Sequence, residues 1–390
     1  MITFQTKANT ILFVDDEANI LTALKRELYG WAKERALVIK TAPSAAIALN
    51  IIESNASEIA VIVSDLKMPE MLGSDFLLEV KNRWPDIITV LLTGFSEPQE
   101  VMKAVKAGIF SYILKPWEQE YLKGELDKAL EMRSVKEQNA TYARLLEDEL
   151  KWAGEMQKAM LRPTLQSTEG IELRVSYQPV PGLYCGGDYY DVVNLPGERY
   201  LILLGDVAGH GVKAAFITGI LKAVIYPEYI RTVGNRPFSP GAFLGWLNER
   251  MTFELRQTSD LLISFFAGVL DRQAMTFSYA NAGQDHPFII SGGNPRELTV
   301  SGSALGVAKT VTYTDQTERL KIGDMIFAYT DGLVEAGSST SGARDSGIAG
   351  ILASLPVSQG YHKAVLEAAL AAAGVATFDD DVTILTARLI

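Results

Sequence analysis

Acidic residues follow two short apolar segments near the start of the chain, where they could do chemistry. Asp15 and Asp16 come directly after the apolar residues 11–14, and Asp65 follows residues 60–63. Three carboxylates gathered in one place would repel one another unless a divalent cation such as Mg²⁺ neutralised them. With a cation bound, the Asp65 carboxylate could attack a phosphoryl group as a nucleophile.

Two further polar residues end later apolar segments of the same region. Thr93 follows residues 87–92, and Lys115 follows residues 111–114. A threonine hydroxyl can hydrogen-bond the oxygens of a phosphoryl group, and a lysine can pair with their charge. One aspartate after a strand is commonly only a turn or cap residue, but suitable residues after successive strands together indicate a phosphoacceptor site.

A second set of acidic residues, in the latter half of the chain, is mostly bracketed by glycine. The set comprises Gly186-Gly187-Asp188, Gly205-Asp206-Val207-Ala208-Gly209-His210-Gly211, Thr330-Asp331-Gly332 and Asp379-Asp380-Asp381-Val382-Thr383. Glycine lets backbone carbonyls approach an ion and permits tight turns after strands. Oxygen ligands without cysteine or several histidines point to Mg²⁺ or Mn²⁺. Two such ions about 3.5–4 Å apart would bridge a water molecule, lower its pKa and stabilise the charge that develops during attack on a phosphate.

Each motif of this second set also has a simpler interpretation. Asp-Gly is common in turns, and the run of aspartates at 379–381 could be an exposed strand edge. The ordered set as a whole favours metal-dependent chemistry. Cys185 does not lie in a Cys-x₅-Arg loop, which disfavours a cysteine-dependent phosphatase. We expect it to be a small buried side chain, and a reactive thiol is the alternative.

Composition excludes several classes of function. A net charge of −11 argues against a nucleic-acid partner, because phosphate binding depends on clustered Lys and Arg. Three histidines and one cysteine make a zinc site improbable and an internal disulfide impossible. No apolar stretch approaches the roughly 20 residues that a membrane helix needs, and the first residues do not follow the plan of a secretory signal. We therefore expect a cytoplasmic protein that does not bind membranes.

The acidic residues of the first set are positioned by alternating strands and helices. Strands are predicted at residues 11–14, 38–41, 60–63, 87–92 and 111–114, with amphipathic helices such as residues 19–28 between them. Strict alternation predicts a doubly wound, five-stranded parallel sheet covered on both faces. The carboxyl ends of its strands form one edge, where ligands bind in such folds. We assign this α/β domain to residues 1–124.

Residues 125–162 are predicted to form a helical linker. Apolar and small residues recur there at intervals of three, four and seven, which is typical of a coiled coil. The seam comprises Met132, Val135, Asn139, Tyr142, Leu146, Ala153, Met156 and Met160. Glu149 falls where an apolar residue is expected. The linker either forms a parallel homodimer or packs on its own C-terminal domain.

Residues 163–390 are predicted to form an α+β domain. Strand patterns occur at residues 200–204, 265–270, 275–279, 325–329 and 382–385. Helical patterns occur at residues 214–226 and 361–373. Several of the acidic residues of the second set stand just beyond the ends of these strands.

The first of these domains resembles a response-regulator receiver domain over residues 8 to about 125. The resemblance rests on Phe13-Val-Asp-Asp-Glu17, Ser64-Asp-Leu-Lys-Met-Pro69 with Gly73, Leu92-Thr-Gly94 and Leu114-Lys-Pro116. It implies that Asp65 is the phosphoacceptor and that Asp15 and Asp16 help it to bind Mg²⁺. It also implies that Thr93 and Tyr112 form a switch pair, and that the Lys115–Pro116 bond is cis. Tyr112 could instead be a plain packing residue.

The segment from about residue 165 to 390 resembles the PPM-type serine/threonine phosphatases, in their bacterial sporulation and stress-response branch. The Gly-Gly-Asp, Gly-Asp-Val-x-Gly-His-Gly, Asn281-Ala-Gly283, Thr-Asp-Gly and Asp-Asp-x-x-Thr motifs carry it. The resemblance implies a β-sandwich flanked by helices and a site for two Mn²⁺ or Mg²⁺. Asp206 would bridge both metals, Asp188 would ligate one or orient its water, and the Val207 carbonyl, Asp331 and Asp380 would complete the site.

The same resemblance leaves three histidines with different expectations. His210 aligns with a histidine near the metal-bound water and is expected to assist proton transfer, with a structural turn residue as the alternative. His286 follows Gln284 and Asp285, whereas relatives often place histidine directly after Gly283. We therefore expect His286 and His362 to be structural.

Together the two resemblances imply a two-component response regulator with an enzymatic output. A cognate histidine kinase would phosphorylate Asp65, and the phosphatase would act on phosphoserine or phosphothreonine in a small protein such as an anti-sigma-factor antagonist. Two other classes remain open: a catalytically silent phosphatase fold that sequesters a regulatory protein, and a nucleotide-cyclising output enzyme. The second would need a phosphate-binding motif such as a P-loop, which we do not find in the sequence.

Overall fold

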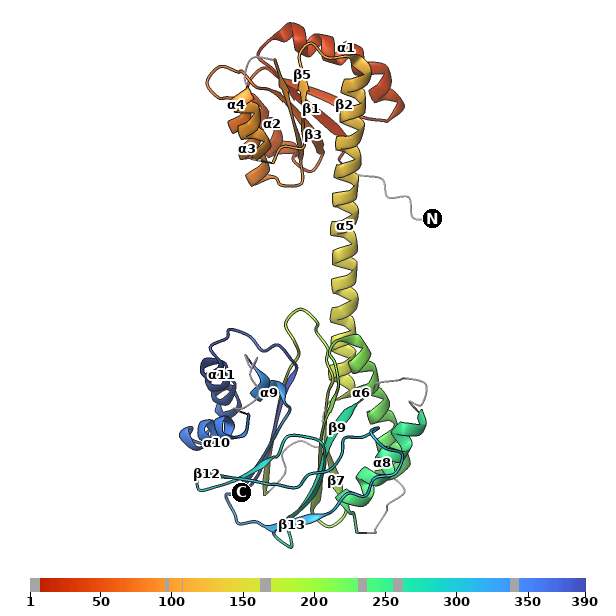
Figure 1. Cartoon of the computed structure of the whole chain (residues 1–390), viewed down its shortest axis with the longest axis vertical. Helices are drawn as coiled ribbons and strands as arrows, with labels where there is room; N and C mark the ends of the chain where they lie inside the picture. The colour runs from red at the N-terminus through yellow and green to blue at the C-terminus, as the bar shows by residue number, and fades with distance from the viewer. Residues whose placement is uncertain are drawn as a thin grey trace. The chain divides into compact units, whose positions relative to one another are not determined.

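The computed structural model describes residues 8–94, 98–106, 108–161, 170–230, 237–254, 262–336 and 344–390. The chain divides into two compact units, Met1–Leu146 and Glu147–Ile390, each with its own sheets (Figure 1). In the part of the chain that the structure describes, no helix combines the length and apolar character needed to span a membrane.

The first unit contains a five-stranded parallel sheet in the order β2-β1-β3-β4-β5. Its strands are β1 (Thr10–Val14), β2 (Val38–Ala42), β3 (Ile59–Asp65), β4 (Ile88–Thr93) and β5 (Ser111–Leu114). β1, β3 and β4 are buried along their whole length, as expected for central parallel strands that are covered on both faces. All five predicted strands are present with small shifts of their ends.

Helices cover both faces of this sheet, so that the unit has two apolar cores. The helices are α1 (Ala18–Glu34), α2 (Ala45–Asn55), α3 (Gly73–Arg83), α4 (Pro98–Lys106) and the first part of α5 (Gln119–Met160). On one face Leu24 of α1 and Leu126 of α5 join the same core. On the other face Ile52 of α2 and Phe76 of α3 join the second core. The predicted doubly wound α/β fold is thus confirmed.

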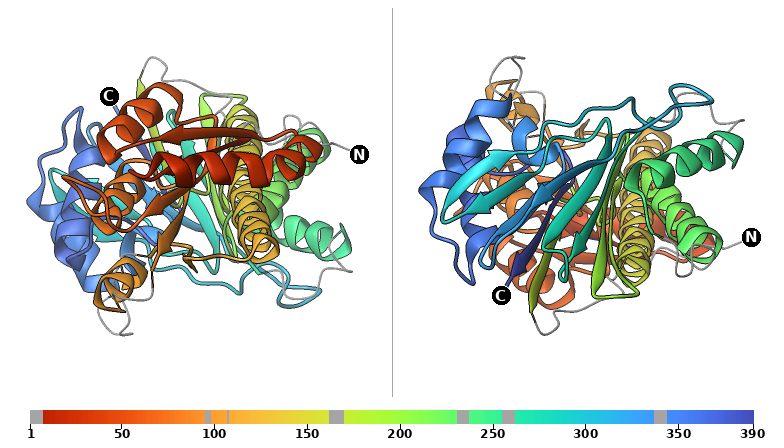
Figure 2. Two further views of the ribbon diagram at one scale, coloured as in Figure 1. Left: turned by 90° about the horizontal axis from the view of Figure 1, so that it is seen from above. Right: turned by 90° about the horizontal axis from the view of Figure 1, so that it is seen from below.

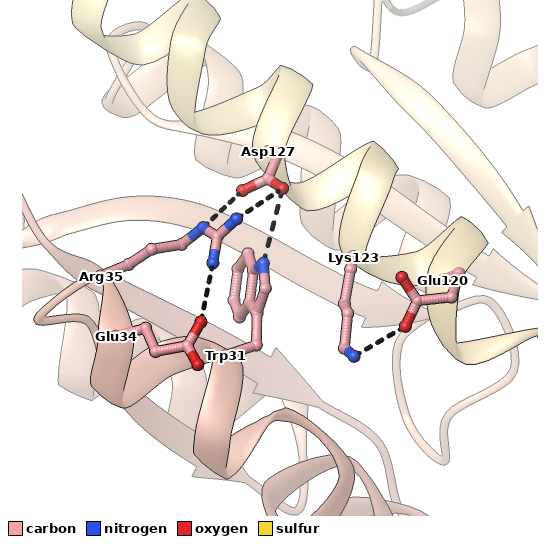
Figure 3. Close-up of polar contacts among 6 residues, drawn as sticks. All are labelled: Trp31, Glu34, Arg35, Glu120, Lys123 and Asp127. Carbon is pink, nitrogen blue, oxygen red and sulfur yellow. Dashed lines mark hydrogen bonds and ion pairs between the residues drawn. The ribbon is translucent and has the colours of Figure 1, made fainter.

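Helix α5 is a single helix that begins in the first unit and ends in the second. Its first turns are fixed to α1 by Asp127, whose carboxylate accepts hydrogen bonds from Arg35 at 3.0 and 3.3 Å and from the Trp31 indole at 3.5 Å (Figure 3). Farther along, most apolar side chains of the predicted seam are exposed, among them Tyr142 and Leu146 at 58% and 62%. The predicted linker bounds, residues 125–162, and its coiled-coil pairing stay predictions.

The second unit contains two five-stranded sheets, with neighbouring strands antiparallel, in the orders β13-β10-β9-β8-β7 and β12-β11-β14-β15-β6. The strands of the first sheet are β7 (Asp188–Leu195), β8 (Arg199–Val207), β9 (Ile263–Asp271), β10 (Thr276–Ala282) and β13 (Gln316–Arg319). Those of the second are β6 (Ile171–Gln178), β11 (Phe288–Ser291), β12 (Asn294–Glu297), β14 (Met325–Tyr329) and β15 (Val382–Leu389). One core contains residues from both sheets, such as Leu203 and Leu385, so that the sheets form a sandwich.

Helices flank this sandwich on both sides, as Figure 2 shows in its right-hand view. They are α6 (Val212–Val224), the π-helical turn η1 (Ile225–Ile230), α8 (Pro240–Glu254), α9 (Gly332–Glu335), α10 (Arg344–Ser354) and α11 (Tyr361–Ala373). The last two pack on the β14–β15 side through a separate core that includes Phe327 and Val365. The predicted α+β sandwich is confirmed, although the helix predicted at residues 214–226 changes from α to π geometry at Ile225.

Candidate functional site

The carboxyl edge of the parallel sheet brings together three of the predicted residues, Asp15, Asp65 and Lys115. The Lys115 ammonium lies 2.8 Å from Asp15 Oδ2 and also pairs with Asp65 Oδ1. Asp15 and Asp65 are buried, whereas Asp16 beside them is exposed. Lys115 precedes a cis peptide bond to Pro116, as the resemblance implied.

The charges at this edge are balanced within the protein. Burial raises the pKa of Asp65, and the hydrogen bond and charge of Lys115 oppose that rise. Burial alone would lower the pKa of Lys115, but its hydrogen bonds to Asp15 and Asp65 outweigh burial, and the net pKa is raised. The backbone N–H of Lys67 donates to Asp65 Oδ2 at 3.0 Å and holds the carboxylate in place.

Glycine at position 73 is required by the close approach of α3 to this edge. A Cβ atom at Gly73 would lie 1.8 Å from the backbone carbonyl oxygen of Asp65. The N–H of Gly73 donates instead to the carbonyl of Leu66 at 2.8 Å. Any larger residue would therefore displace the segment that carries Asp65.

The two residues of the predicted switch pair occupy neighbouring strands. Thr93 ends β4, is buried, and donates its hydroxyl proton to the carbonyl of Gly94 at 3.2 Å. Tyr112 lies on β5 opposite Leu91 and has 43% of its surface exposed. Their role as a switch pair stays a prediction.

The second acidic site is built from both sheets of the sandwich. Asp188 begins β7 and pairs directly with Asp206 of β8, and directly opposed residues of antiparallel strands place their side chains on one face of the sheet. Asp331 lies between β14 and α9, at the N-cap position of that helix. Asp380 precedes β15.

These carboxylates raise one another's pKa. Burial first, and then the charges of Asp331 and Asp380, raise the pKa of Asp206 to about 8. Burial and the charge of Glu335 raise the pKa of Asp331 to about 6. Burial and Asp206 place the pKa of Asp188 well above its ordinary value. No Lys, Arg or His among the described residues forms an ion pair with these four aspartates, and a divalent cation would supply the missing positive charge.

A cradle of oxygen atoms lies beside this cluster, at Gly187. A Cβ atom there would meet the carbonyl oxygens of Val207 and Gly209 at 2.4 and 2.8 Å and Asp206 Oδ1 at 3.2 Å. Carbonyl and carboxylate oxygens are the donors that Mg²⁺ and Mn²⁺ prefer, so the donor set fits such an ion. Within the described ranges, no group of three or more Asp, Glu, His or Cys side chains is already positioned to hold a metal ion.

Sequence reasoning missed three residues that organise this site. Asp381 is buried and its carboxylate accepts hydrogen bonds from the N–H groups of Val180 at 2.9 Å and Gly187 at 2.7 Å. Thr330 and Thr383 both donate hydroxyl protons to Asp188. All three lie within the sequence motifs that contain the predicted metal ligands, and this closeness in sequence could have indicated their role.

A fourth missed residue, Gln284, stands where relatives often have histidine. Its N–H and carbonyl hydrogen-bond the side chain of Asn281, each at 2.8 Å. Its own side chain accepts from Ser264 of β9 at 2.6 Å and donates to the carbonyl of Tyr329 at 3.2 Å. Gln284 thus joins the two sheets next to the strand end that precedes Asp331.

The remaining singled-out residues lie in different environments. His210 is exposed in the loop before α6. Cys185 is fully buried, and burial raises the pKa of its thiol, which disfavours a reactive thiolate. His286 contacts Glu297 and Ser301, and His362 contacts Ser176 and Thr386, so that each ring is held by side-chain partners.

Two family profiles match the chain. The profile of Stage II sporulation protein E (SpoIIE) matches residues 196–390, and that of the response regulator receiver domain matches residues 11–127. The receiver match covers the first acidic site, and the SpoIIE match covers Asp206, Asp331 and Asp380 of the second site but begins after Asp188.

Curated relatives match parts of the chain. Phosphoserine phosphatase RsbU of Bacillus subtilis is 25% identical over 192 residues, which are 49% of this chain and 54% of that protein. Hydrogenase transcriptional regulatory protein HoxA of Cupriavidus necator is 34% identical over 131 residues, which are 33% of this chain and 26% of HoxA. The chain thus spans about a quarter of HoxA and about half of RsbU.

A solved structure supports the assignment of the second unit. The SiaA-PP2C domain of Pseudomonas aeruginosa is 25% identical, and its TM-score is 0.54. The match covers 64% of this chain and all of that domain.

Proposed function

Because the chain belongs to the family of Stage II sporulation protein E and carries a receiver domain before it, we propose that it is a response regulator with a phosphatase output. The output reaction is the metal-dependent hydrolysis of phosphoserine or phosphothreonine in a protein. One observation carries this proposal: Asp206 and Asp331 are half-buried close to each other, their pKa values are raised, and no Lys, Arg or His among the described residues forms an ion pair with them.

Two Mn²⁺ or Mg²⁺ ions would be held by Asp188, Asp206, Asp331, Asp380 and the carbonyl of Val207. When bound, such ions supply positive charge for the phosphate oxygens and lower the pKa of a coordinated water. The protein's own contribution is to fix the oxygen donors. Asp381 anchors the glycine loop at Gly187, and the direct pairing of Asp188 with Asp206 sets two carboxylates side by side.

His210 is proposed to take a proton during hydrolysis. Its ring is exposed in the loop that also carries the Gly209 carbonyl of the oxygen cradle. The alternative, a structural turn residue, predicts no change in the pH dependence of hydrolysis on His210→Gln.

In the receiver domain, Asp65 is proposed to accept a phosphoryl group from a cognate histidine kinase. Asp15, Asp16 and Asp65 would hold Mg²⁺, and Lys115 already pairs with Asp65 and would pair with the phosphoryl charge. Thr93 and Tyr112 would report the modification. A phosphoryl group adds charge and strong acceptor oxygens, which can bias a two-state structural element.

Helix α5 is proposed to transmit this signal. At its receiver end Asp127 binds α1. At its other end Gln157 is buried, and its side-chain amide donates to the carbonyl of Gly186 at 2.7 Å and accepts from its N–H at 3.1 Å. Since Gly186 adjoins the oxygen cradle, a rotation of α5 would move the metal-binding loop. Exposed apolar residues such as Leu146 support pairing of α5 in a homodimer.

The proposed substrate is a small phosphorylated regulatory protein such as an anti-sigma-factor antagonist. The similarity to the phosphoserine phosphatase RsbU supports the reaction class. Purified protein should release phosphate from a phosphorylated antagonist in Mn²⁺, and phosphorylation of Asp65 should change that rate. Equal rates in wild type and Asp65→Asn, with and without a small acyl phosphate, would refute receiver control.

The enzymatic assignment has a direct test. Mn²⁺-dependent hydrolysis of an aryl phosphate should be measured in wild type and in Asp206→Asn. We expect hydrolysis in the wild type alone. A wild type that is inactive with both the aryl phosphate and phosphoserine proteins would favour the alternative function, a silent module that sequesters a regulator.

A further inference from the structure

Two buried threonines, Thr330 and Thr383, donate hydrogen bonds to one oxygen of Asp188. The proposed metal site assigns neither of them a role. We propose that Thr330 and Thr383 are positioning residues that aim the Asp188 carboxylate at the metal. The proposal rests on the proposed function, because it concerns the same site. It adds two residues whose hydroxyl groups set the affinity of that site for its cation.

Both hydroxyl groups converge on the same carboxylate oxygen. Thr383 Oγ1 donates to Asp188 Oδ2 at 2.6 Å, and Thr330 Oγ1 donates to the same oxygen at 2.9 Å. Asp188 Oδ2 is thereby engaged by two donors. The other oxygen of the carboxylate, Oδ1, accepts no hydrogen bond from a side chain of the described residues and can act as a ligand.

A third contact joins the two threonines to each other. The backbone N–H of Thr383 donates to Thr330 Oγ1 at 2.8 Å. A backbone N–H can only donate, so that the Thr330 oxygen must accept there. A hydroxyl group has a single proton, and in Thr330 that proton is then directed to Asp188. An ionised Asp188 carboxylate can only accept, so that both threonine hydroxyl groups donate to its Oδ2 atom.

The backbone holds the two threonines together. The N–H of Thr330 donates to the carbonyl of Thr383 at 3.1 Å, next to the pairing of β14 with β15. Asp188 lies in β7 of the opposite sheet. The two hydroxyl groups thus connect the two sheets of the sandwich at Asp188, the proposed metal ligand at the start of β7.

Burial makes this arrangement rigid. Thr330 and Thr383 have 0% of their surface exposed, and Asp188 has 1%. Water cannot replace a lost hydroxyl donor at such a position without a rearrangement, since buried polar groups depend on protein partners. Side chains that orient a metal ligand typically change metal affinity by about 10–100-fold when they are removed.

The test uses valine and serine at each threonine. Valine keeps the shape of threonine but lacks the hydroxyl, and serine keeps the hydroxyl. Mn²⁺ binding to the full chain should be measured by titration calorimetry, together with the dependence of aryl phosphate hydrolysis on Mn²⁺ concentration. We expect Thr383→Val and Thr330→Val to weaken Mn²⁺ binding by about 10-fold or more. Thr383→Ser and Thr330→Ser should stay within about threefold of the wild type, as retained donors predict.

Thr386→Val is the matched control. Thr386 is a buried threonine of the same strand, β15, and its hydroxyl contacts His362 rather than an aspartate. This variant should bind Mn²⁺ like the wild type. If it weakens Mn²⁺ binding as much as Thr383→Val does, the effect is one of general stability and the proposal is overturned.

The remaining outcomes are distinct. A wild type that binds Mn²⁺ and hydrolyses phosphate, with both valine variants unchanged, overturns this proposal alone. A wild type that neither binds Mn²⁺ nor hydrolyses phosphate overturns the proposed function and this proposal with it. If a valine variant does not fold, the serine variants decide: a serine variant that folds and loses Mn²⁺ affinity as strongly as expected for valine contradicts the role of the hydroxyl.

Discussion

Both acidic sites of this chain bring carboxylates close together, but only one of them contains a side chain that neutralises part of the charge. At the receiver edge, Lys115 lies between Asp15 and Asp65 and neutralises part of their charge. In the phosphatase, Asp206 and Asp331 face further carboxylates, and no Lys, Arg or His of the described residues pairs with them. In the receiver site, Lys115 therefore reduces the repulsion between the carboxylates even without a metal. In the phosphatase site, that repulsion would be relieved by a bound metal.

The two sites also differ in how the fold assembles them. Asp15, Asp65 and Lys115 all follow strands of one parallel sheet, so that the topology alone gathers them at its carboxyl edge. Asp206 lies in the first sheet of the sandwich and Asp331 follows β14 of the second, so that they come close only because the sandwich packs. Local sequence thus has more control over the first site than over the second.

The largest expected effect comes from removing a carboxylate of the phosphatase site. Asp206→Asn should lower Mn²⁺-dependent hydrolysis by about 10³-fold or more, because a bound metal supplies several kcal/mol of transition-state stabilisation. The same change should raise the Tm of the metal-free phosphatase unit, since it removes a charge that repels Asp331 and Asp380. Scanning calorimetry in a chelator measures this shift.

Asp191→Asn is the matched control for this stability measurement. Asp191 is a buried aspartate of the neighbouring strand β7, but it pairs with Lys222 at 2.5 Å. Its replacement should lower the Tm, the opposite sign. If both variants lower the Tm of the metal-free protein, the phosphatase site is not electrostatically strained and the comparison fails.

Removing the Lys115 ammonium group from the receiver site should lower the stability of the receiver domain. Lys115→Met leaves the buried carboxylates of Asp15 and Asp65 without a positively charged partner, which we expect to destabilise the receiver by about 3–5 kcal/mol. Urea unfolding measures the change, and Mg²⁺ should restore part of it. Lys103→Met removes an exposed pair with Asp75 and should have no measurable effect. An equally small effect of Lys115→Met would show that Lys115 does not balance the site.

Breaking the contact between α5 and the glycine loop tests whether the two sites communicate. Gln157→Leu removes both hydrogen bonds to the Gly186 backbone and leaves its N–H and carbonyl buried, at a cost of about 1–3 kcal/mol. Hydrolysis should then no longer respond to phosphorylation of Asp65. Lys158→Leu, an exposed change on the same helix, should leave the response intact. A full response in Gln157→Leu would exclude this contact as the route.

The smallest expected effect concerns a buried polar group of the phosphatase outside the acidic site. Burial, aided by the charge of Arg174, lowers the pKa of His362 to about 4. The unfolded chain binds a proton to this histidine near pH 6.5, so between pH 6.5 and 4 the unfolded state holds more protons and stability falls as the pH falls. The slope contributed is about 1 kcal/mol per pH unit.

His362→Gln should flatten this slope while other titrations remain the same. The free energy of unfolding of both proteins should therefore be compared between pH 6.5 and 4. Parallel slopes would contradict this prediction, because they would mean that folding does not change the pKa of His362.

The receiver half shows how far local patterns reach. Its strands were predicted from short apolar runs, because a central parallel strand buried on both faces needs a continuous apolar sequence. The residues after those strands could then be placed at one edge. What could not be predicted was that Gly73 packs against the Asp65 carbonyl, since that contact depends on the path of the loop between them.

The phosphatase half was predicted less completely. Its acidic motifs indicate metal-dependent hydrolysis and predict Asp380 as a ligand. They assign no role in the site to Asp381, and Gln157 is predicted only to lie in a helix. Both act through partners that are distant in sequence: Asp381 binds Gly187, and Gln157 binds Gly186. No spacing rule connects such residues, because their contacts arise from the packing of separate elements.

By itself the sequence determined the two domains, the order of strand and helix, and the oxygen chemistry of both sites. Periodicity and residue type are local properties, and they suffice for these features. Only the tertiary structure decided which charges are balanced: Lys115 reaches Asp15 across 100 residues, and Thr383 reaches Asp188 across 195. Such balances depend on burial and on distances between remote segments, which exist only once the sheets have packed.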